Sequence, residues 1–326
     1  MAPSAISGHA AMPIRLMENF RALLYAPFYA AHALGFFARE GVEVELLTSS
    51  TPGSAIPRLL AGSIHLTWAG PMRVMKAHDD DPRCRLACFG EVVSRDPFFL
   101  IARRDAGASG LRDLARLELG SVSEVPTPWM CLQHDLREIG IDPAGIARVR
   151  DRTMEENYAA LRAGKLDVMQ AFEPYATWAG NDGVGGVIHA ASERGPTVYT
   201  TFVTTREALA EHRAELLGIT RATAQMQKWL HDRGAEALTE ATAAYFRGIT
   251  PDVLNSSFRR YLAAGLWARE PAISRQGFLR LGQSLLSGGY IRRMVPYESC
   301  VAETLNRSSP EPAEDGQGRR LGGGRD

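Results

Sequence analysis

The side chains of this chain that could hold a small molecule begin with two tyrosines in its first long apolar run. Tyr25 and Tyr29 flank a proline at the start of a helical pattern, where two rings could sandwich a planar ligand. Tyr29 could equally pack inside that helix. His32, one helical turn beyond Phe28, is more typical of a satisfied core histidine than of a catalytic one.

A second set of candidates follows another apolar run, which ends at Trp68. The Trp68 indole offers a flat wall, and Ala69 and Gly70 let a ligand approach the backbone closely. Arg73 could pair with a carboxylate, a sulfonate or a phosphate. The alternative for Arg73 is an ordinary surface charge.

Two hydroxyl-rich loops could bind an oxyanion through side chains and free backbone amides. Ser49 and Ser50 precede Pro52 and a helical pattern, where an ordinary helix cap is at least as good an interpretation. The longer loop, SVSEVPTPW, starts another helix, and its two prolines favour a preformed site. Its candidate contact residues are Ser121, Ser123, Glu124, Thr127 and Trp129.

Acidic and phenolic side chains at strand ends complete the candidates. Glu91 lies near the end of an apolar run, and Glu173 and Tyr175 follow another one. Glu173 could bind a ligand amine or could merely favour the start of a helix. The neighbouring Arg95 and Asp96 could instead pair with each other at a hinge.

No catalytic signature accompanies these residues. The sequence has no Ser-His-Asp order, HExxH, Walker loop or G-x-G-x-x-G that opens a helix. Cys84 and Cys88 lack a CxxC or a histidine pair, so we expect buried thiols and not a metal site or a disulfide. The sequence thus indicates no cofactor and no bound metal.

Composition describes an ordinary globular protein. The chain has 326 residues, and its 37 basic and 37 acidic side chains cancel, which argues against a nucleic-acid partner. No stretch approaches the roughly 20 apolar residues that span a bilayer. The N-terminus lacks the pattern of an export signal, so the sequence as written predicts a cytoplasmic protein, and a different start codon would reopen a periplasmic location.

Strand and helix patterns alternate through the first two-thirds of the chain, which predicts α/β architecture with mostly parallel sheets. The expected strands are Phe20–Tyr25, Val42–Thr48, Ile64–Trp68, Arg85–Val93, Phe98–Arg103, Arg116–Ser121, Ile146–Arg150, Val168–Phe172, Gly186–Ala190 and Val198–Thr205. The expected helices include Phe28–Arg39, Ser54–Ala61, Pro71–His78, Thr127–Ile139, Met154–Ala163 and one from Glu173. Helices then dominate, at Arg206–His212, Ala214–Arg233, Ala235–Tyr245, Pro251–Ala264 and Ser274–Ser287.

The pattern restarts after a glycine-rich connection at residues 104–110, and a β-branched run at Val198–Thr205 returns toward the first part. We therefore expect a first lobe from 15–100 and 198–307, an inserted second lobe from 101–197, and a disordered tail at 308–326. The two crossing strands, Phe98–Arg103 and Val198–Thr205, would form a hinge that lets the lobes close on a ligand.

Three segments carry a resemblance to a known family: LLYAPFYAAHALGFFAREGVEVELL, PGSAIPRLLAGSIHLTWAGPMRVM and LRAGKLDVMQAFEP. They resemble the NMT1/THI5-like group, over roughly Phe20–Trp267. The resemblance implies a type II periplasmic-binding-protein fold. It also implies a solute-binding component of an ABC importer for sulfonates, nitrate or thiamine-pyrimidine precursors.

Two enzyme branches share this fold, and the residues that each branch needs are missing. The thiamine-pyrimidine synthases use a lysine that holds pyridoxal phosphate and then a histidine, at positions that fall near Ala69 and Arg73. The aryl sulfinate desulfinases use a cysteine in the loop after the first strand, which we place at Tyr25–Tyr29 and which has no thiol.

We therefore expect a solute-binding protein that closes on a small, aromatic or heteroaromatic or anionic molecule, with an ABC permease as a possible partner. One alternative is a cytoplasmic enzyme on the same fold, with Glu91, Asp96, Glu173 and His32 as candidate general acids or bases. Another alternative is a ligand sensor with no role in transport.

Overall fold

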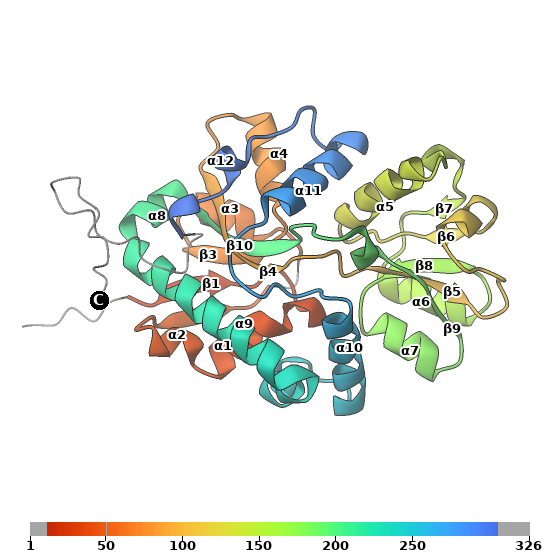
Figure 1. The fold of residues 1–326 in the computed structure, drawn as a ribbon, viewed down its shortest axis with the longest axis horizontal. Coiled ribbons are helices and arrows are strands. Elements are labelled where there is room, and N and C mark those ends of the chain that lie inside the picture. The colour runs from red at the N-terminus through yellow and green to blue at the C-terminus, as the bar shows by residue number, and fades with distance from the viewer. Residues whose placement is uncertain (1–11, 50, 306–326) are drawn as a thin grey trace, which may run out of the picture.

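The protein consists of two α/β lobes that lie side by side, each built on a five-stranded sheet (Figure 1). The computed structural model describes residues 12–49 and 51–305. Ser50 and the tail from 308 lie outside the described residues. The expected fold class, a two-lobed α/β protein with helices on the sheets, is confirmed.

In both sheets four strands share one direction and a single strand opposes them. The first sheet has the order β2-β1-β3-β10-β4, and β10 is antiparallel to both of its neighbours. Its strands are β1 (Ile14–Met17), β2 (Val44–Leu47), β3 (Leu66–Ala69), β4 (Leu86–Val93) and β10 (Thr200–Thr205). The strand β10 thus returns to the first sheet, as the sequence predicted.

The second sheet contains only strands from the middle of the chain. Its order is β7-β6-β8-β5-β9, and β5 is the strand that opposes the others. These strands are β5 (Phe99–Arg103), β6 (Leu119–Gly120), β7 (Arg148–Val149), β8 (Val168–Ala171) and β9 (Gly185–Ala190).

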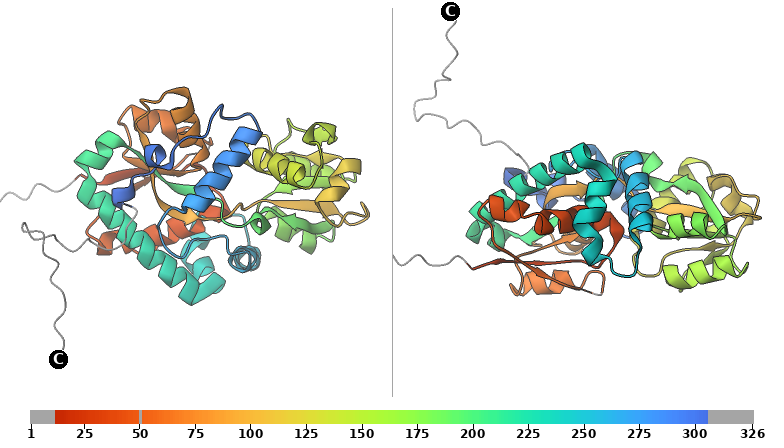
Figure 2. Two further views of the ribbon diagram at one scale, coloured as in Figure 1. Left: turned by 45° about the horizontal axis from the view of Figure 1, so that its top comes forward. Right: turned by 90° about the horizontal axis from the view of Figure 1, so that it is seen from below.

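Helices cover both sheets, and two of them lie at the border of the lobes. Around the first sheet lie α1 (Ala26–Ala33), α2 (Phe36–Arg39), α3 (Ala55–Leu60), α4 (Met72–Asp80), α8 (Arg206–Glu211), α9 (Arg213–Thr242) and α12 (Tyr297–Cys300). Around the second lie α5 (Thr127–Glu138), α6 (Met154–Arg162) and α7 (Tyr175–Asn181). The border helices are α10 (Pro251–Ala263), which packs against α7, and α11 (Arg275–Ser287), the blue helix against α5 in Figure 2.

The expected first strand, Phe20–Tyr25, is wrong. The strand lies earlier, at Ile14–Met17, where it pairs in parallel with β2 and β3. Leu23–Tyr25 instead forms a 3₁₀ turn that leads directly into α1. A short apolar run fits a buried strand or a buried helical turn equally well, so periodicity alone could not decide.

Glycines interrupt the helical backbone at two places in the first lobe. The expected helix Phe28–Arg39 is split into α1 and α2 by Gly35, whose φ of 70° interrupts the helical backbone. The helices expected on either side of Gly234 are confirmed as the two helical parts of α9, which is kinked at Gly234, where φ is 74° and ψ is −164°. The fold is otherwise close to the pattern in the sequence.

The chain crosses between the lobes in two short segments, 94–98 and 195–199. The strands that follow them, β5 and β10, each lie wholly in one sheet. The segments pair with each other, because the Thr197 amide donates to the Ser94 carbonyl at 2.8 Å and the Tyr199 amide to the Val93 carbonyl at 2.9 Å. The expected Arg95–Asp96 pair is wrong: Asp96 binds Arg194 at 2.8 Å, and Arg95 donates to a backbone carbonyl.

Among the described residues, no helix combines the length and the apolar character that crossing a lipid bilayer requires.

Candidate ligand-binding site

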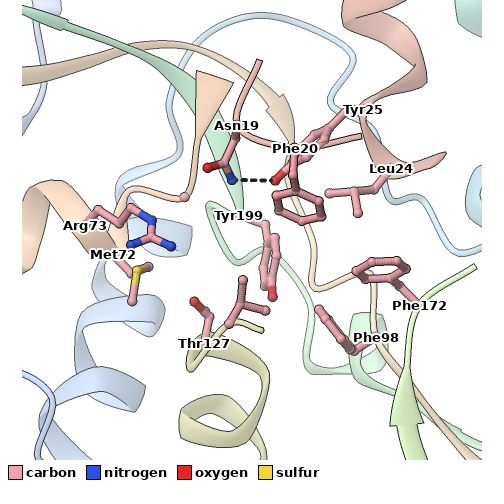
Figure 3. Close-up of a pocket in the computed structure, with 12 residues that line it drawn as sticks. Asn19, Phe20, Leu24, Tyr25, Met72, Arg73, Phe98, Thr127, Phe172 and Tyr199 are labelled. Atoms are coloured by element: carbon pink, nitrogen blue, oxygen red, sulfur yellow. Dashed lines mark hydrogen bonds between the residues drawn. The ribbon is translucent and has the colours of Figure 1, made fainter. Parts of the chain in front are cut away.

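A partly open cavity lies between the lobes, at the ends of strands from both sheets (Figure 3). It holds about 430 Å³ of space outside the protein atoms, including its opening. Its lining residues are Asn19, Phe20, Leu24, Tyr25, Gly70, Met72, Arg73, Phe98, Val125, Thr127, Phe172 and Tyr199. We call this space the inner cavity. Arg73 and Met72 lie on one side of it, and Phe98 and Phe172 on the other.

Asn19 orients one polar edge of the inner cavity. Its side-chain Nδ2 donates to the Tyr25 hydroxyl at 3.2 Å, and its Oδ1 accepts from the Gly53 amide at 2.8 Å. Burial raises the pKa of Tyr25 to about 12, so the phenol keeps its proton at neutral pH. Because the oxygen already accepts from Asn19, the Tyr25 proton can be donated to a partner.

Arg73 supplies a cation to the cavity from the first turn of α4. The guanidinium packs flat on the backbone of Gly53, where an added Cβ would come within 2.5 Å of Nη1. Gly53 also has a φ of 82°, which glycine adopts without strain. Both the close guanidinium and the backbone conformation therefore favour glycine at this position. Among the described residues, none forms an ion pair or a hydrogen bond with the Arg73 guanidinium, whereas the Arg73 backbone amide donates to the Gly70 carbonyl at 3.1 Å. A held but unpaired guanidinium is suited to an anionic group.

The second lobe adds the start of α5. Thr127 is the first residue of this helix, and its first helical hydrogen bond runs from the Met130 amide to the Pro126 carbonyl at 3.2 Å. The earlier amides and the helix dipole therefore place partial positive charge near the cavity. This partial positive charge would attract an anionic group from the second lobe, as the Arg73 guanidinium would from the first.

The remaining walls are aromatic. Phe20, from the first lobe, stacks on Phe172, from the second, with ring centroids 6.3 Å apart and planes at 24°. Phe98 meets Phe172 edge to face at 5.1 Å. Tyr199 lies between the lobes, and burial holds the pKa of its phenol well above the usual value, so its hydroxyl stays neutral. Such walls are suited to a flat or apolar ligand body.

The cavity brings together four of the predicted contact residues: Tyr25, Gly70, Arg73 and Thr127. Tyr29 and Trp68 do not line it. Tyr29 is fully buried and donates its hydroxyl to Glu18 at 2.5 Å, and Trp68 stacks on Phe28 at 4.7 Å in the core. Ala69, the last residue of β3, is also buried behind the cavity wall.

Other predicted residues make structural contacts outside the inner cavity. The hydroxyl of Ser49 meets that of Ser54 at 2.8 Å, and Glu91 accepts from the Ser274 amide at 2.9 Å. The Ser121 hydroxyl donates to a carbonyl of β7, and Arg148 covers the Trp129 ring at 4.1 Å. The exposed Ser123 hydroxyl lies near Glu124. Ser50 lies outside the described residues.

Glu124, Glu173 and Tyr175 line a second, larger cavity next to the first. Glu173 is fully buried, and its carboxylate accepts from Arg260 at 2.6 Å and from the Thr177 amide at 2.9 Å. Its own amide donates to the Tyr261 hydroxyl at 2.9 Å. The carboxylate of Glu173 therefore already has partners from both lobes.

Three of the lining residues that the sequence analysis missed closely follow β1 or β8. Asn19 and Phe20 follow β1, and they were missed because the first strand was placed too late in the chain. The sequence pattern predicts a strand that ends at Phe172, whereas β8 ends at Ala171 and Phe172 follows it directly. Tyr199 could have been found from its place in the returning segment, which must pass between the lobes.

No cysteine lines either cavity. Cys88, Cys131 and Cys300 are buried and Cys84 is partly buried, all as free thiols. Burial raises the pKa of Cys88 and of Cys131 to about 12, which opposes formation of a thiolate. The loop after the first strand is 18–22, not Tyr25–Tyr29 as expected, and it too has no cysteine.

Comparisons with known proteins agree with this geometry. A family model described as "NMT1/THI5 like" matches residues 24–237, about two-thirds of the chain. The chain is 23% identical, over 90% of its length and 88% of the relative's, to the "Putative binding protein YtlA" of Bacillus subtilis (strain 168).

Solved structures with a similar fold include binding proteins and an enzyme. The periplasmic aliphatic sulphonate binding protein SsuA from Escherichia coli has a TM-score of 0.73 at 15% identity, over 90% of this chain and 98% of that one. The desulfurization enzyme DSZB has a TM-score of 0.69 at 15% identity, over 90% and 98%. These likenesses show the fold alone, whereas the family match extends over most of the chain. The chain therefore belongs to the NMT1/THI5-like family.

Proposed function

We propose that this protein is a solute-binding protein that closes two lobes around a small anion with an aromatic or heteroaromatic body. The observation that carries the proposal is Arg73, an unpaired guanidinium fixed against Gly53 at the wall of an aromatic cavity. The start of α5 and the Tyr25 hydroxyl would complete the anion site. Sulfonates, nitrate and thiamine-pyrimidine precursors are the candidate ligand classes.

Binding is coupled to closure in this proposal. We assign residues 15–100 and 198–307 to one lobe and 101–197 to the other, with the segments 94–98 and 195–199 as the hinge. A ligand held by Arg73 from one lobe and by α5 from the other favours the closed form, because only that form makes both contacts. An ABC permease that recognises the closed form is the proposed partner, as suggested by the likeness to a sulfonate-binding protein.

An enzyme on the same fold is the second candidate, suggested by the likeness to a desulfurization enzyme. The candidate acids and bases of this chain do not converge on one cavity. Glu91, Asp96 and His32 line neither cavity, and Glu173 lines only the second one, where it is paired. His32 instead hydrogen-bonds the Tyr245 hydroxyl at 3.0 Å. These placements favour binding over chemistry.

Arg73→Ala should weaken the binding of an anionic probe such as benzenesulfonate by about 1.5–3 kcal/mol, because a charged hydrogen bond is lost. Isothermal titration calorimetry measures this change. Arg83→Ala is the matched control, since Arg83 is highly exposed and pairs only with Asp81 on the surface. Equal affinities for the wild type and Arg73→Ala would remove Arg73 from the site.

A further inference from the structure

The second cavity adjoins the inner one and is larger and more open. It holds about 1010 Å³ of space outside the protein atoms, including its opening to solvent. We call it the outer chamber. Its walls come from both lobes. The first lobe contributes Phe20, Arg21, Ala22, Leu23, Pro52 and residues of 245–249, and the second lobe contributes chiefly residues of 124–125 and 172–178.

The two spaces share part of their walls. Phe20, Val125 and Phe172 line both of them. The Phe20 and Phe172 rings meet across the lobe boundary through ring stacking. A ligand that displaced either of these rings would join the inner cavity to the outer chamber. A single ligand can therefore occupy both.

The outer chamber has flat aromatic walls from both lobes. Tyr175 and Trp178, on α7, meet at right angles with centroids 5.3 Å apart. Tyr245, from the first lobe, stacks on Tyr29 at 4.7 Å, which fixes its ring against the core. Rings held in this way offer preformed surface to another flat group.

The charged groups of the outer chamber are mostly engaged with the protein. Glu173 is paired with Arg260, and Glu124 accepts from the Met154 amide at 2.9 Å. Arg21 pairs with Glu18 at 3.1 Å. Arg247 is exposed and has no described partner. The chamber thus offers aromatic surface without a free carboxylate to repel an anion.

We propose that the outer chamber is a second compartment of the ligand site, which takes a flat aromatic extension of the molecule whose anionic group lies at Arg73. This inference rests on the proposed function of the inner cavity and narrows the ligand to an elongated aryl anion. The pairing of Glu173 with Arg260 ties the start of α7 to α10, so the Tyr175 and Trp178 wall of the outer chamber is held against the first lobe.

The test compares three sulfonates of increasing length by titration calorimetry: ethanesulfonate, benzenesulfonate and biphenyl-4-sulfonate. We expect biphenyl-4-sulfonate to bind at least tenfold more tightly than benzenesulfonate. Trp178→Ala should abolish most of this gain and leave the affinity for benzenesulfonate within twofold. Trp178→Phe, which keeps a ring, should retain the gain.

Tyr245→Ala provides an independent variant from the other lobe, should Trp178→Ala fail to fold. It should reduce the biphenyl gain as well. If benzenesulfonate binds and depends on Arg73, but the second ring adds nothing or its gain survives both variants, the outer chamber is not part of the site. If no sulfonate binds or if Arg73→Ala has no effect, the proposed anion site itself is contradicted.

Discussion

Arg194→Met should lower the free energy of unfolding by about 3–5 kcal/mol, as is typical when one member of a buried ion cluster is removed. The Arg194 side chain is only 6% exposed and lies between Asp96, at 2.8 Å, and Asp135, to which it donates from two nitrogens. Without it, two carboxylates lose their counter-charge inside the protein. Urea unfolding at neutral pH measures the change.

Arg116→Met is the matched control for this substitution. Arg116 pairs with Asp113 on the surface at 2.8 Å, and its side chain is 52% exposed. Exposed pairs contribute about 0–1 kcal/mol, so the two variants should differ clearly. Comparable small losses in both would show that the Arg194 cluster is not a stabilising element of the hinge.

The cluster also has a functional consequence. Asp96 lies in the first crossing segment, Arg194 just before the second, and Asp135 on α5. The three side chains therefore link both crossings to the helix whose start faces the inner cavity. We expect the hinge and the anion site to move as one unit when the lobes close.

Glu91→Gln should remove a large pH dependence of stability. Burial raises the pKa of Glu91 to about 8 from its usual 4.5, and only the Ser274 amide opposes this shift. A carboxyl group whose pKa is raised in the folded protein stabilises the fold at pH values below its pKa in the unfolded chain. This contribution is lost as the pH rises through the pKa of the group in the folded protein. Between pH 4.5 and about 8, the wild type should therefore lose about 1.4 kcal/mol per pH unit relative to Glu91→Gln.

Urea unfolding of both proteins at several pH values in this window tests the prediction, which amounts to about 5 kcal/mol over the whole window. The comparison removes other titrating groups, such as Asp96, because both proteins share them. Glu298→Gln is a suitable surface control, since Glu298 pairs with the exposed Arg275. Parallel stability curves for the wild type and Glu91→Gln would contradict the buried, protonated state of Glu91.

Most of the fold could be predicted from the alternation of strand and helix patterns. The return of the chain through Val198–Thr205 was recognisable as a β-branched run just before the helical region that begins at Arg206, and β10 lies there. The first strand was not recognisable in the same way. Ile14–Met17 has only four residues and its partners, β2 and β3, come later in the chain. Only pairing in three dimensions distinguishes it from the longer apolar run that follows.

The candidate site was predicted where polar residues follow strands, as for Arg73 and Thr127. The aromatic residues were harder to assign, because a ring serves a core and a ligand site equally well. Trp68 and Tyr29 became core residues, whereas Phe20 and Phe172 face the cavity. Which face of an element is buried against neighbours depends on packing that the sequence pattern does not contain.

Native mass spectrometry with benzenesulfonate tests the central claim most directly, namely that the cavity at Arg73 binds a small anion without chemical change. The account predicts a complex with one probe molecule per chain. The probe should leave with unchanged mass when the protein is unfolded, and the complex should be strongly reduced in Arg73→Ala. A covalent adduct, an altered probe after long incubation, or no complex at millimolar probe would contradict it.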